Sequence, residues 1–271
     1  MLKKRVIFTL LYDDGYFMLS RNFRLQKVGD LSWLQKNYDF SSIAFSIDEL
    51  IILDVSRNNR DESKFCACVK ALTKGCFVPI SAGGAIRSVE EARKLLHSGA
   101  DKIIVNTLIH SEPEIVEEMV SEFGSQCVIA SIDVKKVGDI YEVWIENGTV
   151  RLAVLAVEWL QKLIKFPVGE IYLNSMDRDG TGQGYFMELL DLLPNNVTKP
   201  IILAGGAGKY NHFSEGLRDD RVDAVATAHL FNFVGDGLKT ARQSLIGEGF
   251  SLPHWDVELL DNLKGSVKNL C

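Results

Sequence analysis

The sequence lacks the residue patterns that define several classes of protein. Its cysteines, five in all, are odd in number and show no CxxC spacing, so they predict neither a disulfide framework nor a zinc site. No apolar run reaches the roughly 18 to 20 residues that a membrane-spanning helix needs. The N-terminal residues MLKKR lead into a strand-like segment and not into the apolar part of a signal peptide. We therefore expect a soluble, cytoplasmic protein without a metal or cofactor.

A block of positive charge is also missing. The 271 residues carry a formal net charge of −6, with a pI near 5.5. This balance argues against nucleic acid and against an anionic membrane surface as partners. Small anionic substrates remain compatible with it, because backbone amides at helix starts bind anions whatever the global charge.

Short apolar runs alternate with longer amphipathic stretches along the whole chain. This alternation is typical of a parallel β-sheet covered by helices. With 46% hydrophobic residues the chain is able to bury one large core, and we expect a single domain over residues 1–271. The pattern predicts strands at residues 5–11, 49–54, 77–82, 102–106, 127–133, 170–174, 200–204 and 223–227.

The two halves of the chain resemble each other. Gly83 and Gly205 begin Gly-Gly pairs that lie 122 positions apart, and Glu49 and Glu170 begin apolar runs that lie 121 apart. Eight βα units with this repeat predict an α/β fold, a (β/α)₈ TIM barrel built from two half-barrel repeats at about 1–125 and 126–250. A C-terminal extension, residues 251–271, is predicted to end in a helix. Residues 134–149 predict a hairpin after the fifth strand.

Each Gly-Gly pair follows a predicted strand and precedes a predicted helix, which is an arrangement suited to phosphate binding. Two such sites across one barrel mouth predict a bisphosphate-like substrate. The alternative is that each pair only forms a tight turn between strand and helix. The residues expected around the first site are Gly83, Gly84, Asn106 and Thr107, and those around the second are Gly205, Gly206, Ala228 and His229.

Carboxylates follow several predicted strands, at the end of the barrel where active sites lie. Asp133 ends the fifth strand, in a position suited to a general acid or base, and Asp179 with Gly180 follows the sixth. Asp54 ends the second. An aspartate at a strand end also serves as a helix cap or loop hydrogen-bonding group, so its position alone does not establish a catalytic role.

Four ordered runs resemble the cyclase subunit of imidazole glycerol phosphate synthase: GADK at 99–102, FGSQC at 123–127, SMDRDGT at 175–181 and AGGAGK at 204–209. The resemblance covers about residues 1–250. It implies a barrel that receives ammonia from a glutaminase docked on its bottom face and uses it above, on a phosphorylated ribosyl substrate. It further implies that Asp133 is one of two catalytic aspartates, and that substrate and phosphates contact Gly84, Asn106, Thr107, Asp179, Gly180, Gly206 and Ala228.

The other catalytic aspartate is absent. Leu11 occupies its position, and Leu19 occupies that of a family lysine eight residues later. A leucine cannot transfer a proton, and acid–base groups commonly contribute about 10² to 10⁴ in rate. The residues nearest in sequence that are able to replace the lost acid are Asp13 and Asp14, although a shift of two positions usually misplaces a reacting group.

The family's ammonia entrance is retained. In the family a ring of alternating charges closes the barrel bottom, and the resemblance places Arg5, Glu49, Lys102 and Glu170 in it. Two acids and two bases that point into a barrel are expected to neutralise one another. Asp101 matches a contact to the glutaminase. The alternative is that the four charges only close the bottom of the barrel.

The chain combines retained phosphate loops and a retained ring with a lost aspartate. Ala85 replaces a family glycine and His229 a family serine, which indicates an altered ligand. This combination resembles a diverged branch associated with glycosyl amidation in bacterial surface-polysaccharide clusters. The resemblance implies ammonia supply to a separate amidotransferase that converts a sugar acetamido group to an acetamidino group in lipopolysaccharide or O-antigen biosynthesis. Two alternatives remain: an authentic cyclase of histidine biosynthesis that uses Asp13 or Asp14, and a non-catalytic scaffold that activates a glutaminase.

Overall fold

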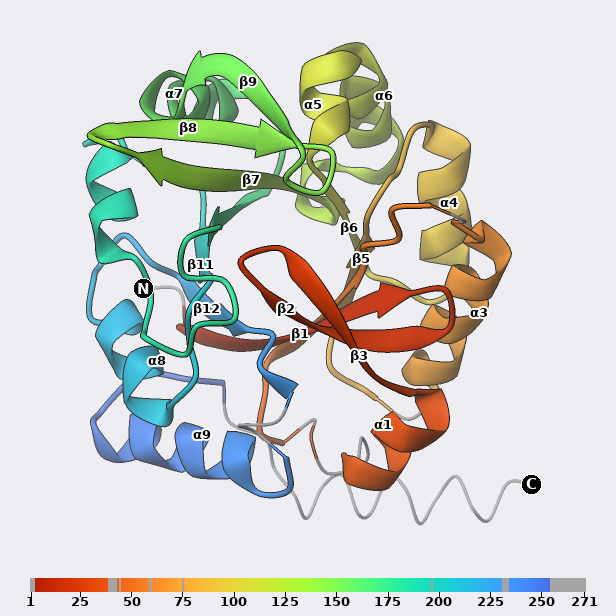
Figure 1. Cartoon of the computed structure of the whole chain (residues 1–271), viewed down its shortest axis with the longest axis vertical. Helices are drawn as coiled ribbons and strands as arrows, with labels where there is room; N and C mark the ends of the chain where they lie inside the picture. Colours follow the sequence, from red (N-terminus) through yellow and green to blue (C-terminus); the bar gives the residue numbers. More distant parts are fainter. Residues whose placement is uncertain are drawn as a thin grey trace.

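A closed barrel of parallel strands forms the centre of the protein (Figure 1). The computed structural model describes residues 3–253 apart from 39–42, 44, 59, 75, 196 and 231–233. Neighbouring strands follow one another in chain order, and the barrel closes through parallel pairing of β1 with β12 and of β7 with β10. The predicted (β/α)₈ barrel is confirmed. Its strands are β1 (Arg5–Asp13), β4 (Glu49–Asp54), β5 (Ile80–Gly83), β6 (Lys102–Val105), β7 (Val128–Val137), β10 (Glu170–Ser175), β11 (Ile201–Ala204) and β12 (Ala224–Thr227).

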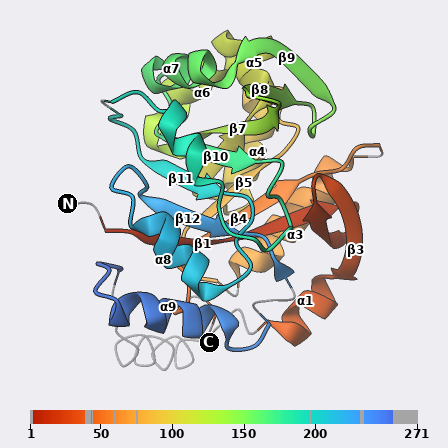
Figure 2. The same ribbon diagram turned by 60° about the vertical axis from the view of Figure 1, so that its left-hand side comes forward.

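Helices surround the barrel on the outside (Figure 2). Successive side chains of a strand point to opposite faces, so each strand contributes to two cores. In β1, Phe8 and Leu10 belong to the large core between strands and helices, whereas Ile7 belongs to a small cluster inside the barrel. The helices are α1 (Leu31–Asn37), α3 (Glu62–Thr73), α4 (Val89–His97), α5 (Thr107–Ser111), α6 (Pro113–Phe123), α7 (Ala156–Lys165), α8 (Tyr210–Leu217) and α9 (Gly237–Gly247), with 3₁₀ turns η1 (Ser125–Cys127) and η2 (Met187–Leu192).

Two antiparallel extensions continue from the barrel strands. β2 (Tyr16–Arg21) and β3 (Arg24–Asp30) extend β1, while β8 (Ile140–Ile145) and β9 (Val150–Leu155) extend β7. The second extension confirms the hairpin predicted after the fifth strand. The first was not predicted: β1 continues beyond residue 11, where the first strand was expected to end, and Asp13 ends it opposite Tyr16. Asp14 and Gly15 form the turn between them, both with positive φ (39° and 91°).

The two half-barrels correspond in side-chain contacts as well as in topology. Asp101 accepts a hydrogen bond from the Ile80 backbone N–H at 2.8 Å, and Asp223, 122 positions later, accepts one from the Ile201 N–H at 3.0 Å. Each aspartate precedes a barrel strand and caps the start of the neighbouring one. Asp101 therefore has a structural role in the barrel itself, although its side chain is exposed at the bottom.

A buried ion pair attaches the last described helix to the barrel. Arg242 of α9 contacts Asp48, just before β4, at 2.9 Å, and both side chains are almost fully buried. In the part of the chain that the structure describes, no helix is long and apolar enough to cross a membrane. The helix predicted for the C-terminal extension lies outside the described residues, which end at Pro253.

Candidate functional site

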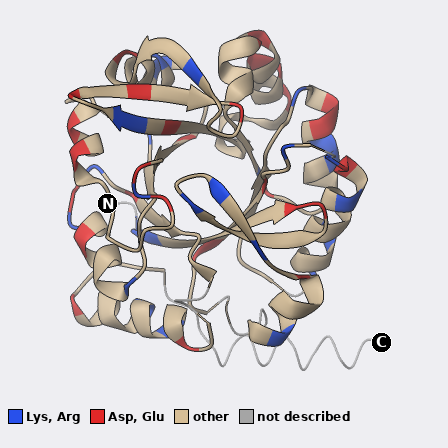
Figure 3. Cartoon of the chain, in the orientation of Figure 1, with Lys and Arg blue, Asp and Glu red and all other residues tan. Residues whose placement is uncertain are grey.

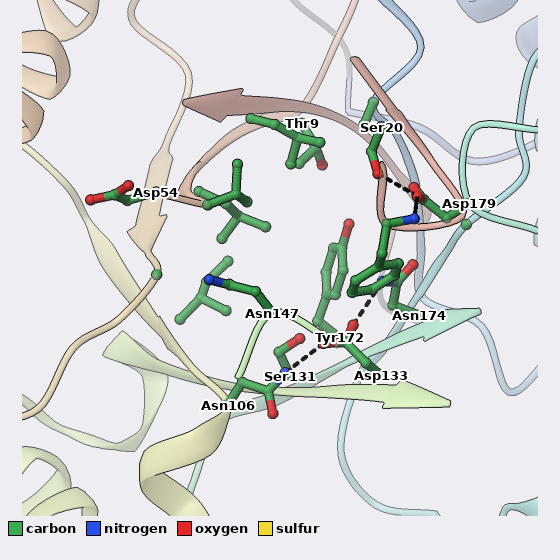
Figure 4. Close-up of a pocket in the computed structure, with 18 of the residues that line it drawn as sticks. Thr9, Ser20, Asp54, Asn106, Ser131, Asp133, Asn147, Tyr172, Asn174 and Asp179 are labelled. Carbon is green, nitrogen blue, oxygen red and sulfur yellow. Dashed lines mark hydrogen bonds between the residues drawn. The ribbon is translucent and has the colours of Figure 1, made fainter. Parts of the chain in front are cut away.

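A cavity opens at the carboxyl ends of the barrel strands (Figure 4). Leu11 and Asp54 line it, but Gly83 does not; a Cβ at Gly83 would lie 2.4 Å from the Ile104 carbonyl oxygen on the next strand. Residues expected in two separate phosphate sites therefore share one cavity. The predicted site residues that line it are Gly84, Asn106, Thr107, Asp133, Asp179, Gly180, Gly205, Gly206, Ala228 and His229.

Asp133 projects from β7 into this cavity and is held between two amides. Asn106 donates its Nδ2–H to one carboxylate oxygen at 2.7 Å, and Asn174 donates to the other at 2.8 Å (Figure 4). Burial raises the pKa of Asp133 to about 6; the two hydrogen bonds oppose this rise, and the charge of Asp179 adds to it. A carboxyl that is fixed in position and titrates near neutral pH is suited to acid–base work.

Leu11 lines the same cavity from β1 and is 8% exposed. It stands 122 positions before Asp133, so the two side chains occupy equivalent places in the two half-barrels. Asp13 and Asp14 do not line the cavity; they border a separate groove beside the β2–β3 hairpin, where Asp14 forms an ion pair with Lys64 at 2.9 Å. In this arrangement neither aspartate occupies the place of the lost acid.

Asp179 binds the first hairpin to the loop after β10. Its carboxylate accepts hydrogen bonds from the Ser20 hydroxyl and from the Phe23 backbone N–H, the latter at 2.9 Å (Figure 4). Burial raises the pKa of Asp179, against the effect of these two hydrogen bonds. The Asn22 N–H also donates to the Asp179 carbonyl at 2.9 Å. The carboxylate is thus engaged in closing the side of the cavity.

The Gly-Gly turns are required by chain packing even without a ligand. Gly84 has a φ of 102°, and a Cβ there would lie 2.0 Å from the Asp54 carbonyl oxygen. Gly206, 122 positions later, has a φ of 106°, and its Cβ would lie 2.2 Å from the Gly184 carbonyl oxygen. Side chains are excluded at both positions. The glycines alone therefore do not demonstrate phosphate binding.

The helices that follow the two turns differ at their starts. Before α4, Ser88 accepts a hydrogen bond from the Glu91 N–H, and the Glu91 carboxylate accepts one from the Arg87 N–H at 2.9 Å. α8 begins after Lys209 with no side-chain cap. Unsatisfied amides at a helix start attract anions. The start of α8 lacks the side-chain cap that α4 has, although the Gly208 N–H just before it donates to His212 Nδ1 at 3.2 Å.

A closed ring of four charged side chains occupies the opposite end of the barrel. Lys102 contacts Glu49 at 3.3 Å and Glu170 at 2.6 Å, and Arg5 contacts the same two acids. Their side chains are 6–18% exposed. Burial tends to raise the pKa of Glu170, but hydrogen bonds and attraction from Arg5 and Lys102 outweigh it and hold that pKa below its usual value. The four residues placed here by the sequence resemblance thus neutralise one another.

The sequence was compared with known proteins. The family described as histidine biosynthesis proteins matches residues 30–235. A protein of Parasynechococcus marenigrum (strain WH8102), provisionally named imidazole glycerol phosphate synthase subunit hisF2, is 49% identical over 243 residues, which is 90% of each chain. The chain belongs to the histidine biosynthesis protein family. The resemblance inferred from the sequence motifs is thereby confirmed at the level of the family.

Several cavity residues of this family member were not singled out from the sequence. Tyr172 and Asn174 lie at alternate positions after Glu170 on β10. Alternate side chains of a strand point to the same face, so both were predictable on the inner face of the barrel, with Glu170. Arg57 and Arg87, in loops, carry no such signal. Among the described residues, no cluster of three or more histidine, cysteine, aspartate or glutamate side chains is arranged to hold a metal ion. Other lining residues without a prediction include Thr9, Ser20 and Ser131.

Proposed function

We propose that the chain is an ammonia-delivering barrel that works with a glutaminase on its bottom face. The nitrogen is supplied for amidation of a sugar, acetamido to acetamidino, in lipopolysaccharide or O-antigen biosynthesis. The observation that supports this best is the closed ring of Arg5, Glu49, Lys102 and Glu170 at one end of a barrel that has a polar cavity at its other end. A separate amidotransferase is assigned the step that forms the C–N bond.

The interior between ring and cavity suits a small neutral molecule. Ile7, Ile51 and Ile104 belong to the apolar cluster there, and an apolar interior disfavours ammonium far more than ammonia. Two buried hydroxyls lie there: that of Ser81 has no hydrogen-bond partner among the described residues, and that of Thr9 is near enough to the Tyr172 hydroxyl to share a hydrogen bond with it. Both side chains alternate with outward-facing neighbours on β1 and β5 and therefore face inward. They are able to exchange hydrogen bonds with ammonia in an otherwise apolar passage.

The cavity itself favours delivery over cyclase chemistry. A two-aspartate reaction needs a second titrating group opposite Asp133, where this chain has Leu11. The two aspartates nearest to it in sequence, Asp13 and Asp14, lie in the side groove. We therefore assign Asp133, held in place by Asn106 and Asn174, to accepting hydrogen bonds from the neutral ammonia that arrives from below, as Asp133 is largely ionised at neutral pH.

The proposal is tested by reconstitution. Purified barrel, glutaminase and candidate sugar amidotransferase are incubated with amide-¹⁵N glutamine, and the sugar product is analysed by mass spectrometry. We expect ¹⁵N in the acetamidino group only when the barrel is present, even when unlabelled ammonium is added as a competitor. Equal amidine formation without the barrel would refute the proposal.

Variants of the ring separate delivery from glutaminase activation. Lys102→Ala and Glu170→Ala are expected to leave glutamine hydrolysis largely intact and to release the ammonia into solution. Lys94→Ala, which removes a surface lysine paired with Glu62 on the outer helices, is the matched control and should keep coupling intact. Glutaminase stimulation without any isotope transfer would instead favour the scaffold, and complementation of a histidine auxotroph would favour the authentic cyclase.

A further inference from the structure

Arg57 stands in the wall between the barrel cavity and a second groove. It follows β4 in the chain, is exposed, and lines both hollows. The second groove runs beside the β2–β3 hairpin, and Leu25 of that hairpin is the other residue shared by the two linings. A ligand that leaves the cavity toward this groove therefore passes Arg57. The remaining residues of the groove are Asp13, Asp14, Tyr16, Met18, Lys27 and Asn58.

The guanidinium of Arg57 uses only part of its hydrogen-bonding capacity. Its Nη2 donates to the Phe23 carbonyl at 2.5 Å and to the Asn147 carbonyl at 3.4 Å, at the tips of the two hairpin extensions. Within the described part of the chain its Nε and Nη1 donate to no protein group. A guanidinium has five N–H donors in a planar fork, so most of them remain available at the junction of the two hollows.

Among the residues that the structure describes, Arg57 also has no acidic partner. The carboxylates that form ion pairs around it do so with other bases: Asp54 with Arg60 at 3.2 Å, and Glu146 with Arg87 at 3.0 Å. No ion pair of Arg57 occurs among the described residues. Of the two acids in the side groove, Asp14 pairs with Lys64, and Asp13 forms no ion pair among the described residues. Because Arg57 pairs with neither of them, its charge is able to attract an anion from solution.

The adjacent hairpin tip adds further positive charge. Arg21 and Arg24 face each other across β2 and β3, on either side of the turn that contains Phe23. Like charges directly opposite each other destabilise a hairpin, and neither arginine forms an ion pair within the described residues. The tip lies across the centre of the view in Figure 3, where its basic positions are blue. Two arginines without an ion pair among the described residues therefore lie at this side of the mouth, next to Arg57.

We propose that Arg57 binds an anionic group of a substrate that extends from the barrel cavity into the side groove. The group is a phosphate or a carboxylate, either of which accepts two parallel hydrogen bonds from a guanidinium fork. The substrate then carries negative charge outside the barrel, in addition to any group bound at the Gly-Gly turns. The inference rests on the cavity as the substrate site and does not depend on ammonia delivery.

Titration calorimetry with two small anions tests the assignment on the intact chain without a glutaminase. Inorganic pyrophosphate probes phosphate binding and succinate probes carboxylate binding. Arg57→Gln removes the charge and leaves a shorter, polar side chain, and Arg57→Lys keeps the charge without the fork. Arg93→Ala, which removes a half-buried arginine of α4 that pairs with Glu90 and Glu122 and lines neither hollow, is the control for net charge.

We expect Arg57→Gln to weaken binding of the preferred anion about tenfold, Arg57→Lys to weaken it less, and Arg93→Ala to leave it within twofold of wild type. The anion whose affinity falls identifies the group as phosphate or carboxylate. No measurable binding of either anion to the wild type, less than a twofold change in Arg57→Gln, or an equal loss in Arg93→Ala would overturn the assignment. Ammonia delivery is tested separately, by isotope transfer in the reconstituted system.

Discussion

Leu11 and Asp133 face the same cavity from equivalent positions of the two half-barrels, 122 residues apart. The barrel symmetry thus pairs a side chain that cannot titrate with a carboxyl whose pKa is raised to about 6. This difference between the two half-barrels lies where a two-aspartate enzyme would have its two proton-transferring groups. It is the main reason to separate this chain from a two-aspartate enzyme.

Leu11→Asp is expected to make the cavity more acidic without restoring cyclase activity. A second buried carboxylate near Asp133 raises the apparent pKa values of the pair and lowers the free energy of unfolding at pH 7 by about 2 kcal/mol or more. NMR titration of the carboxyl carbons measures the first effect and urea denaturation the second. Leu11→Asn is the neutral control.

The double variant Leu11→Asp/Leu19→Lys tests whether those two side chains are all that is missing. Leu19 lies on β2 opposite Gln26 and does not line the cavity, so we expect no cyclase turnover. Turnover above the Leu11→Asn background would contradict this placement of Leu19.

Asp133→Asn should change stability in a pH-dependent way. In the wild type the folded carboxyl holds its proton up to about pH 6, whereas the unfolded one loses it near 3.8, so wild-type stability falls as pH rises through this window. The asparagine does not titrate. The unfolding free energy of the variant, relative to wild type, should therefore rise by on the order of 3 kcal/mol between pH 3.5 and pH 7.5.

Chemical denaturation at several pH values between these limits measures the difference in unfolding free energy between the two proteins. The titration of every other group cancels in this difference, because both proteins contain those groups. The same relative stability at every pH would show that Asp133 does not titrate where its environment indicates.

Glu170→Gln should weaken the barrel bottom most at neutral pH. Arg5 and Lys102 would be left to share Glu49, and removal of one partner from a buried ionic cluster costs about 3 to 5 kcal/mol. Because the pKa of Glu170 is held below its usual value, its contribution is present above about pH 4.5 and is lost as pH falls through the folded value. Urea denaturation at pH 7 and pH 3.5 should show the two proteins converging in acid. A pH-independent difference would mean that the charge of Glu170 does not stabilise the ring.

Gly84→Ala should destabilise the fold more than Gly138→Ala. Both glycines have positive φ, but a Cβ at Gly84 meets the Asp54 backbone at 2.0 Å, whereas nothing lies within 4 Å of one at Gly138. We expect about 1 kcal/mol for the control, from the backbone conformation, and at least 3 kcal/mol for Gly84→Ala, measured as free energies of unfolding. Equal losses of unfolding free energy in the two variants would show that the Asp54 backbone moves away from the new Cβ without cost.

The barrel was predictable because its strands are buried on both faces. Strands such as β4, ELIILD, are nearly continuous apolar runs with turn residues after them, and their carboxyl ends define one functional end of the barrel. β3, RLQKVGD, is mostly exposed and has no such run, so the first hairpin was missed. Its one local signal was Asp14-Gly15 between two aromatic-containing segments, a typical hairpin turn.

The site was predictable where a residue is tied to a strand end or to a family motif, as for Asp133, Asn106 and the ring. Arg57 was not, because its position depends on where two hairpins from different halves of the chain meet. Nothing in the residues around position 57 specifies that meeting. Contacts of this kind arise from the three-dimensional register of distant segments and have no local sequence signature.

The four-membered ring has a mechanical property that a single ion pair would not have. Each acid contacts both bases, so Lys102 is able to swing aside while Glu49 and Glu170 each keep their contact with Arg5. No carboxylate is then left bare. Lysine has a flexible stem and a single charged point, whereas arginine has a rigid fork that here engages two acids. The contacts therefore allow the ring to open at Lys102 while Arg5 stays in place.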